Sequence, residues 1–136
     1  MSKGYLLDTN IAIAILTNER NVIDFVQQSS RDKMQIYFSA VTVSEVFAGL
    51  KHEEQLHAEK LFTTKRCIDV TLEIAKFAGT LRRDLIGKGR KLKTPDALII
   101  ATASIHELTL VSRDSDMNVV RDGLDIPLLN IDSNYF

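Results

Sequence analysis

Asp8 is the first residue of the chain whose type and setting point to chemistry. It lies in the stretch GYLLDTNIAI, where one short apolar run ends and a second begins at Ile11. A carboxylate between two buried segments is costly unless a hydrogen-bond donor, a cation or a metal ion compensates its charge. The sequence therefore predicts that Asp8 has such a partner.

Four more carboxylates occupy comparable positions later in the chain. Glu45 lies in TVSEVF and Asp96 in TPDALII, each near the start of an apolar helical segment. Asp114 and Asp116 follow the apolar run LTLV, in the stretch VSRDSDM. Each acid alone has an ordinary explanation as a helix cap, a turn residue or a first-turn acid. Those explanations account for the type of each residue. They do not explain why all of these acids directly follow an apolar run or lie near the start of an apolar helical segment.

The segments that carry these acids alternate between strand and helix patterns. Short apolar runs predict strands at residues 5–7, 36–38, 67–70, 108–111 and 128–131. Apolar positions at helical spacing predict helices over 11–16, after a cap at Asn21, after a cap at Thr42 or Ser44, over 72–86, and from a cap at Thr94 to Ile105. This alternation predicts an α/β fold, a three-layer α/β/α sandwich with a mainly parallel sheet of about four to five strands, in one domain over residues 1–136.

A parallel sheet gathers the acids at one edge. Ligands of such sheets bind beyond the carboxyl ends of the strands, where Asp8, Glu45 and Asp114 are expected. Clustered carboxylates repel one another unless a cation neutralises them. Oxygen ligands without His or Cys suit Mg²⁺ or Mn²⁺ rather than zinc, and the three histidines lie in charged or helix-end segments. The sequence therefore predicts a magnesium or manganese site.

Composition favours a globular protein and leaves its binding partners open. The chain has 136 residues, of which 45% are hydrophobic and 26% charged, and a formal net charge of -1. Recognition of phosphate must then depend on local charge, since bulk charge does not favour it. The single cysteine, Cys67, is expected to be a small buried residue at a strand start and fits a reducing compartment. No segment is long and apolar enough to predict a membrane helix, so we expect a cytoplasmic protein.

Four segments together resemble the PIN-domain nucleases, most closely the short VapC-type ribonuclease toxins of type II toxin–antitoxin systems. They are LLDTN, TVSEVFAGL, TPDALIIATA and LVSRDSDM, and they occur in the family's order over nearly the whole chain. The resemblance implies a PIN-like fold and an acidic active site made of Asp8, Glu45, Asp96 and Asp114. Asp116 matches a more variable acidic position, as a metal ligand or an outer group.

The resemblance also implies supporting residues and a reaction. Thr9, Asn10 and Ser112 match the polar positions that surround the acids. Asp8, Asp96 and Asp114 are expected to be the principal ligands of Mg²⁺ or Mn²⁺, and Glu45 to bind metal or to orient water. The implied activity is that of a metal-dependent endoribonuclease, which hydrolyses RNA phosphodiester bonds.

A basic stretch next to Asp96 provides a candidate RNA contact. The segment GKGRKLKTPD places four cations before this acid, and Arg113 adds another beside Asp114. A solvated loop is the better explanation of any one lysine, but the cluster as a whole favours contact with the phosphates that flank a scissile bond. The cluster consists of Lys88, Arg90, Lys91 and Lys93, with Arg82 and Arg83 as possible extensions.

Partners and rival functions follow from the same resemblance. VapC-type toxins form homodimers and are inhibited by a small cognate antitoxin in a hetero-oligomer, so both kinds of partner are expected beside the RNA substrate. The alternatives are a PIN nuclease of RNA processing, a non-catalytic RNA-binding PIN module, and a phosphoacceptor domain with a nucleophilic aspartate. The phosphoacceptor is disfavoured, because phosphatases of that class have a second acid where this chain has Asn10.

Overall fold

The fold is built on a five-stranded, wholly parallel sheet. The computed structural model describes residues 4–113, 117 and 127–131. The strand order is β3-β2-β1-β4-β5, and every neighbouring pair is parallel. The strands are β1 (Gly4–Leu7), β2 (Gln35–Ser39), β3 (Arg66–Ile68), β4 (Thr109–Ser112) and β5 (Leu128–Asn130).

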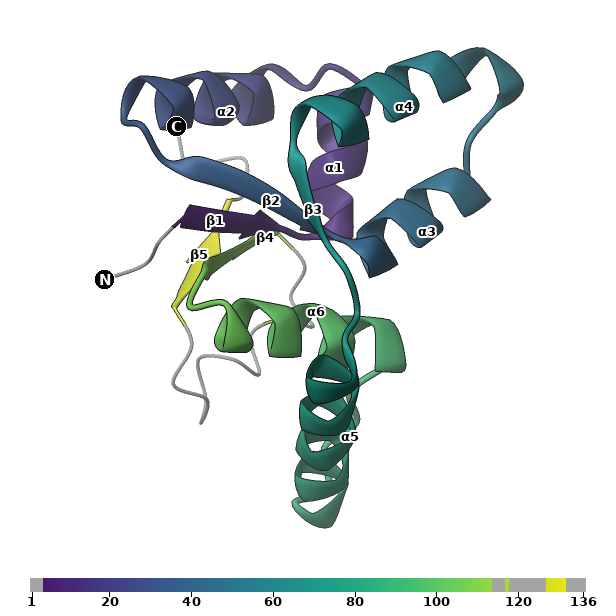
Figure 1. Cartoon of the computed structure of the whole chain (residues 1–136), viewed down its shortest axis with the longest axis vertical. Helices are drawn as coiled ribbons and strands as arrows, with labels where there is room; N and C mark the ends of the chain where they lie inside the picture. Colours follow the sequence, from purple (N-terminus) through teal and green to yellow (C-terminus); the bar gives the residue numbers. More distant parts are fainter. Residues whose placement is uncertain (1–3, 114–116, 118–126, 132–136) are drawn as a thin grey trace.

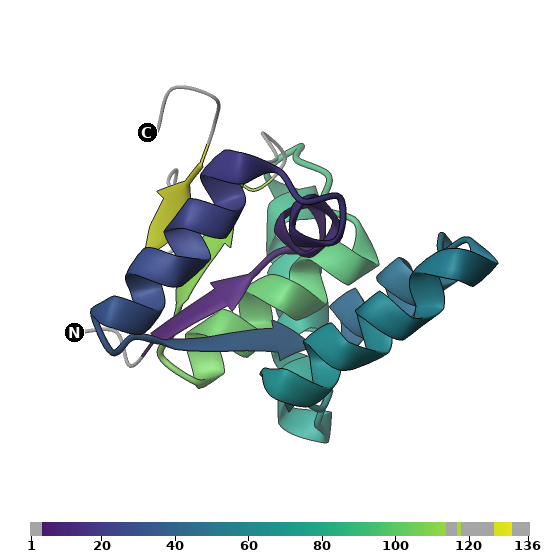
Figure 2. The ribbon, with the colours of Figure 1, turned by 90° about the horizontal axis from the view of Figure 1, so that it is seen from above.

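Helices cover both faces of the sheet, which confirms the predicted three-layer α/β/α sandwich (Figure 1). Helices α1, α2 and α4 lie on one face and α5 and α6 on the other, while α3 continues from the end of β2, as the view from above also shows (Figure 2). The helices are α1 (Thr9–Leu16), α2 (Arg20–Arg31), α3 (Ala40–Ala48), α4 (Gln55–Thr64), α5 (Leu72–Gly87) and α6 (Thr94–Ile105), with a 3₁₀ turn, η1 (His52–Glu54), before α4. Within the described residues, no helix is long and apolar enough to cross a membrane.

The central strands are apolar because both of their faces are buried. Leu6 of β1 and Leu110 of β4 pack into the core beneath α5 and α6. Leu7 and Val111, the next residue of each strand, pack into the opposite core beneath α1 and α2. This alternation explains the continuous apolar runs, which are typical of parallel strands covered on both sides.

Two helices begin earlier than predicted because their caps lie at the very end of the preceding strand or directly after it. Ser39, the last residue of β2, caps α3 and accepts a hydrogen bond from the backbone N–H of Val41 at 3.1 Å. The predictions of a cap at Thr42 or Ser44 were therefore wrong, since both residues lie inside the helix. Asp8 caps α1 in the same way, directly after β1. When a helix follows a strand without a loop, no loop residue is present to act as its N-cap.

Two other predicted caps also differ from the structure. Glu19 stands at the N-cap of α2, and Asn21 lies inside the helix, where it accepts a hydrogen bond from the backbone N–H of Val22. Lys93 precedes α6, so Thr94 is its first helical residue rather than its cap. The predicted apolar character of α6 is confirmed, because half of its residues are buried and its apolar residues pack into the core with α5.

Cys67 is exposed, so the prediction of a buried cysteine was wrong. Strand β3 lies at the edge of the sheet and is only three residues long, and its burial is incomplete. The thiol is nevertheless partly desolvated. Burial, and then the negative charge of Asp69, raise the pKa of Cys67 above its ordinary value.

This raised pKa predicts slow thiol chemistry despite the exposure. Since the thiolate is the reactive form, Cys67 of the folded chain should react with Ellman's reagent more slowly at pH 8 than in the urea-unfolded chain. Its pH–rate curve should be displaced to higher pH. Asp69→Asn should move the curve part of the way back, because it removes the second cause of the shift. Identical curves for the folded and unfolded chains would contradict this prediction.

Candidate active site at the carboxyl edge of the sheet

The candidate site lies where the strand order of the sheet changes direction. From β1 the chain proceeds to β2 and β3 on one side and then crosses to β4 and β5 on the other. The carboxyl ends of β1 and β4 therefore flank a topological switch point, the position at which open parallel sheets bind their ligands. Asp8 follows β1 directly, and Ser112 is the last residue of β4.

Asp8 is buried, and hydrogen bonds from both sides fix its carboxylate. The residue is 3% exposed. Its Oδ1 accepts a hydrogen bond from the backbone N–H of Thr9 at 2.8 Å, and its Oδ2 accepts one from the hydroxyl of Ser112 at 2.7 Å. Its own backbone N–H donates to the carbonyl of Val111 at 2.9 Å. The predicted compensation of the Asp8 charge thus comes in part from Thr9 and Ser112, and the N-terminus of α1 adds a favourable dipole.

A chain of hydroxyl groups connects the start of α1 to Glu45 in α3. The hydroxyl of Thr9 donates a hydrogen bond to Glu45 Oε1 at 2.6 Å. The hydroxyl of Thr42 lies 3.2 Å from that of Thr9, and Thr42 is fully buried. Because Thr9 already donates its proton to Glu45, Thr42 is the donor of the second bond. These contacts join the start of α1 to two residues of α3 and orient Glu45.

Thr42 is the residue of this network that the sequence analysis did not assign to the site. It was considered there only as a helix cap. Its spacing from Glu45 is the signal that was available, because residues three apart share a face of a helix. The partner on that face, Thr9, could not be inferred without the packing of α1 against α3.

Asp96 lies in the first turn of α6, whose N-terminus faces the same edge of the sheet. Helix α6 leads directly into β4 and runs antiparallel to it, so it begins on the side where β1 and β4 end (Figure 1). Asp96 is half-buried. The topology therefore places the start of α6, and with it Asp96, at the carboxyl edge, a position that the sequence pattern alone left open.

The basic segment forms the connection between α5 and α6. Lys88, Lys91 and Lys93 are exposed, and Arg90 is half-buried. Leu92 anchors the segment, since its side chain is buried and its carbonyl accepts a hydrogen bond from Arg82 Nε at 2.9 Å. The guanidinium of Arg82 is therefore engaged in holding this connection, whereas the lysines extend into solvent next to the N-terminus of α6.

Arg113 and Asn10 lie beside Ser112 and link it to the start of α2. The guanidinium of Arg113 forms an ion pair with Glu19. Asn10 makes two long contacts of 3.5 Å, from its amide nitrogen to the Ser112 hydroxyl and from the Arg113 backbone N–H to its amide oxygen. A phosphate that bound Arg113 would compete with Glu19, so the RNA contact predicted for Arg113 carries a cost that the sequence did not reveal.

The donor chemistry of the site fits a hard divalent cation. Asp8, Glu45 and Asp96 provide only carboxylate oxygens, the ligands that Mg²⁺ and Mn²⁺ prefer. Within residues 4–113, 117 and 127–131, no three His, Cys, Asp or Glu side chains form a group able to hold a metal ion. Asp114 and Asp116, two predicted ligands, lie outside the described residues. The complete ligand set therefore stays a prediction.

Comparison with known proteins identifies the family of this fold. A family model described as the PIN domain matches residues 5–123. The comparison with curated proteins found no match.

Solved structures of similar shape cover almost the whole chain. The VapBC2 complex of Rickettsia felis, bound to a promoter DNA fragment, has a TM-score of 0.79 at 22% identity and covers 94% of this chain and 98% of its own. DNA-bound VapBC of Salmonella typhimurium has a TM-score of 0.80 at 18% identity, with coverage of 96% and 98%. A toxin–antitoxin complex from Klebsiella pneumoniae has a TM-score of 0.70 at 27% identity, with coverage of 93% and 97%.

Proposed function

The chain belongs to the PIN domain family, and on that premise we propose that it is a metal-dependent endoribonuclease, the toxin of a type II toxin–antitoxin pair. The observation that carries the proposal is the buried carboxylate of Asp8 at the switch point of the sheet. A buried carboxylate at this position is a natural metal ligand, and the hydroxyls of Ser112 and Thr9 hold Asp8 and Glu45 in fixed orientations.

The residues that would hold Mg²⁺ or Mn²⁺ are Asp8, Asp96 and Asp114, with Glu45 and Asp116 as further ligands or water-orienting groups. When bound, such an ion lowers the pKa of water and stabilises negative charge on the attacked phosphate. The protein's own contribution is orientation. Ser112 fixes the carboxylate of Asp8, and Thr9 fixes that of Glu45, by hydrogen bonds of 2.7 and 2.6 Å. Hydrogen bonds of this kind set the direction of a ligand and keep it rigid.

RNA binding is assigned to the cations around the start of α6. Lys88, Lys91 and Lys93 are exposed beside Asp96, and Arg90 lies among them. Cations here would hold the phosphates on either side of the scissile bond while the acids face the bond itself. Arg113 would join them at the expense of its ion pair with Glu19.

The toxin role is supported by the kind of protein that shares this fold. The Klebsiella structure, which has 27% identity to this chain, is a toxin–antitoxin complex. We propose a small cognate antitoxin as the partner of this chain, in a hetero-oligomer that includes a homodimer of the nuclease.

Removal of divalent metal tests the activity directly. The purified chain, incubated with single-stranded RNA and Mg²⁺ or Mn²⁺, is expected to produce internal cleavage products on a denaturing gel. EDTA should abolish cleavage, and an excess of Mg²⁺ or Mn²⁺ should restore it. Cleavage that persists in EDTA would remove the metal from the mechanism, and a phosphorylated aspartate detected by mass spectrometry would favour the phosphoacceptor alternative.

Thr42 should act on the reaction through Thr9 and Glu45. Thr42→Val keeps the shape of the side chain but removes the hydroxyl that lies 3.2 Å from that of Thr9. We expect kcat to fall about tenfold with little change in KM, and the free energy of unfolding to fall by about 1 kcal/mol. Thr42→Ser, which retains the hydroxyl, should recover most of kcat. Equal kcat for the valine and serine variants would show that the hydroxyl does not position the site.

A further inference from the structure

The connection between α5 and α6 begins with a turn of defined backbone path. Helix α5 extends away from the sheet, and the chain then returns to the start of α6 (Figure 1). The backbone N–H groups of Lys88 and Arg90 both donate to the carbonyl of Leu85, at 3.0 and 2.8 Å. Gly89, between them, has a φ of +74°, the left-handed conformation that commonly ends a helix. The turn is therefore closed by hydrogen bonds to α5 itself.

Beyond the turn, Leu92 and Arg82 hold the rest of the connection. Leu92 is 6% exposed and belongs to the core shared by α5, α6 and the sheet. Its carbonyl accepts a hydrogen bond of 2.9 Å from Nε of Arg82, a half-buried residue of α5. Because the donor is ionised, this hydrogen bond is of the stronger kind. It fixes the backbone between two exposed residues, Lys91 and Lys93.

The direction of these two lysines follows from the burial of Leu92. Side chains alternate in direction along an extended backbone, and Lys93 has the extended dihedral angles φ -67° and ψ 148°. Since Leu92 is turned into the core, the lysines before and after it are both turned to solvent. The anchored backbone thus presents two ammonium groups on a common side, directly before α6 and Asp96.

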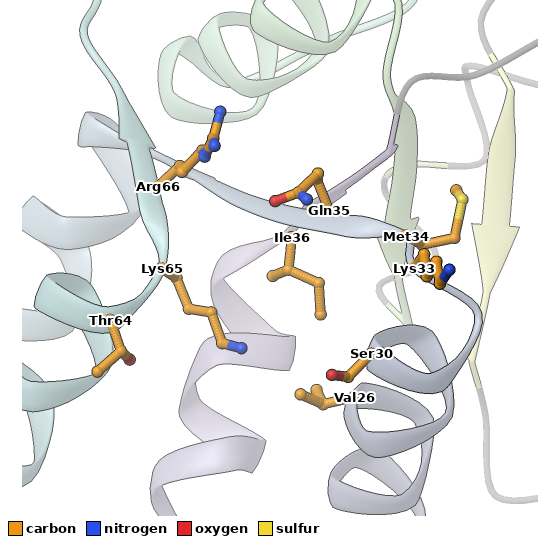
Figure 3. A pocket seen from close by; sticks show the side chains of 9 residues that line it. All are labelled: Val26, Ser30, Lys33, Met34, Gln35, Ile36, Thr64, Lys65 and Arg66. Atoms are coloured by element: carbon orange, nitrogen blue, oxygen red, sulfur yellow. The ribbon is translucent and has the colours of Figure 1, made fainter.

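A pair of cations at the opposite edge of the sheet shows why this spacing matters. Lys65 and Arg66 are adjacent in the connection from α4 to β3, and their side chains lie on opposite sides of β2 (Figure 3). In that arrangement they cannot share one phosphate. Positive charge alone therefore does not make a phosphate site, because the backbone must also hold the cations on the same side.

We propose that Arg82 is a positioning residue for RNA binding. It holds the backbone of Leu92, so that Lys91 and Lys93 are arranged for the phosphates of RNA before the RNA arrives. The inference rests on the proposed ribonuclease function, which assigns these lysines to RNA. A prearranged backbone lowers the entropy cost of ordering a loop on binding. Arg82 acts through Leu92, and its own charge is not the contact.

The Arg82 bond should affect RNA binding and leave the acids in place. Half of the residues of α6 are buried, so the packing of this helix holds Asp96 without Arg82. Among residues 88–93, all of which the structure describes, only Leu92 is buried. Loss of the bond should therefore loosen the connection alone. In the cleavage reaction, the expected result is a higher KM for RNA with kcat unchanged.

Two substitutions separate the hydrogen bond of Arg82 from its charge. The amide nitrogen of glutamine stands at the same place along the side chain as Nε of arginine, so Arg82→Gln keeps the donor to Leu92 and removes the charge. Arg82→Met keeps a side chain of similar length and removes both. Lys76→Met is the control, because it takes an exposed cation from the first half of α5. Thermal unfolding shows that each variant is folded.

Proteolysis tests the support of the backbone without RNA. The connection contains four residues after which trypsin cuts, and a protease needs a segment that can open locally. We expect cutting within residues 88–93 to be slow in the unmodified chain and in Arg82→Gln, and several times faster in Arg82→Met. Mass spectrometry of the first fragments gives these rates. Equal rates in the three chains would overturn the role of Arg82 as a support.

RNA affinity tests the consequence for binding. Anisotropy of a labelled oligouridylate is measured in EDTA with Asp8→Asn as the background, so that neither metal nor cleavage contributes. We expect the dissociation constant to rise about fivefold for Arg82→Met, the equivalent of one lost hydrogen bond. It should be unchanged for Arg82→Gln and Lys76→Met. Equal losses in the two Arg82 variants would make its charge a direct contact, and no loss in either would leave it without a role; both overturn the proposal.

The same measurements distinguish a failure of this inference from a failure of the proposed function. A chain that binds RNA with the expected difference between the Arg82 variants, but does not cleave it, would refute the nuclease and leave the positioning role. A chain that cleaves RNA with the same KM in all three forms would refute the positioning role and leave the nuclease. A chain that does not bind RNA in the anisotropy experiment would overturn the inference as well.

Discussion

Asp8→Asn is expected to reduce RNA cleavage by more than about 100-fold. Loss of a group that merely orients a metal ligand typically costs 10- to 100-fold, and Asp8 is proposed as a ligand itself. The substitution keeps the size and shape of the side chain, but it removes the negative charge and replaces one of the two acceptor oxygens by an NH2 donor. Cleavage rates measured at saturating Mg²⁺ or Mn²⁺ give the size of the effect, and induction in a bacterium should show that the variant no longer slows growth.

The fold should tolerate this substitution, which makes the result interpretable. Asn is as good an N-cap as Asp, so α1 should still begin at Thr9. Removing a charge from a residue that is 3% exposed also relieves a desolvation cost. We therefore expect a melting temperature no lower than that of the unmodified chain. Undiminished cleavage by a folded Asp8→Asn variant would refute the proposed site, and a wild-type chain that does not slow growth would refute the toxin role.

Phe38→Ala should produce the largest loss of stability. Phe38 is fully buried in β2, and its ring meets that of Phe62 edge-on at a centroid separation of 5.1 Å. Truncation of such a residue costs about 3–5 kcal/mol, a large share of the roughly 5–15 kcal/mol that stabilises a domain. Urea unfolding followed by circular dichroism gives the change in the free energy of unfolding.

Phe47→Ala is the matched control for this prediction. Phe47 also packs near Phe62, at a ring separation of 6.2 Å, but it is 37% exposed. Its removal creates no enclosed cavity, and we expect a cost of about 1 kcal/mol. Equal destabilisation by the two variants would show that the space between β2 and α4 collapses around the missing ring.

The local sequence determined the elements and the residue types of the candidate site. Alternating apolar runs predicted the parallel strands because the central strands are buried on both faces, and the apolar character of residues 94–105 predicted a buried helix. Asp8, placed between two such runs, was predicted to need a partner. These features depend only on neighbours within a few positions, because buried positions of a strand or helix are occupied by apolar residues at a characteristic spacing.

The tertiary structure decided which side chains meet. The switch point arises from the strand order, and the bond from Ser112 to Asp8 joins residues 104 positions apart. The role of Thr42 depends on the packing of α3 against α1, and the exposure of Cys67 depends on the edge position of β3. The spacing of apolar residues along the chain predicts whether a residue is buried. It does not predict which residue it packs against, because that residue comes from a distant part of the chain.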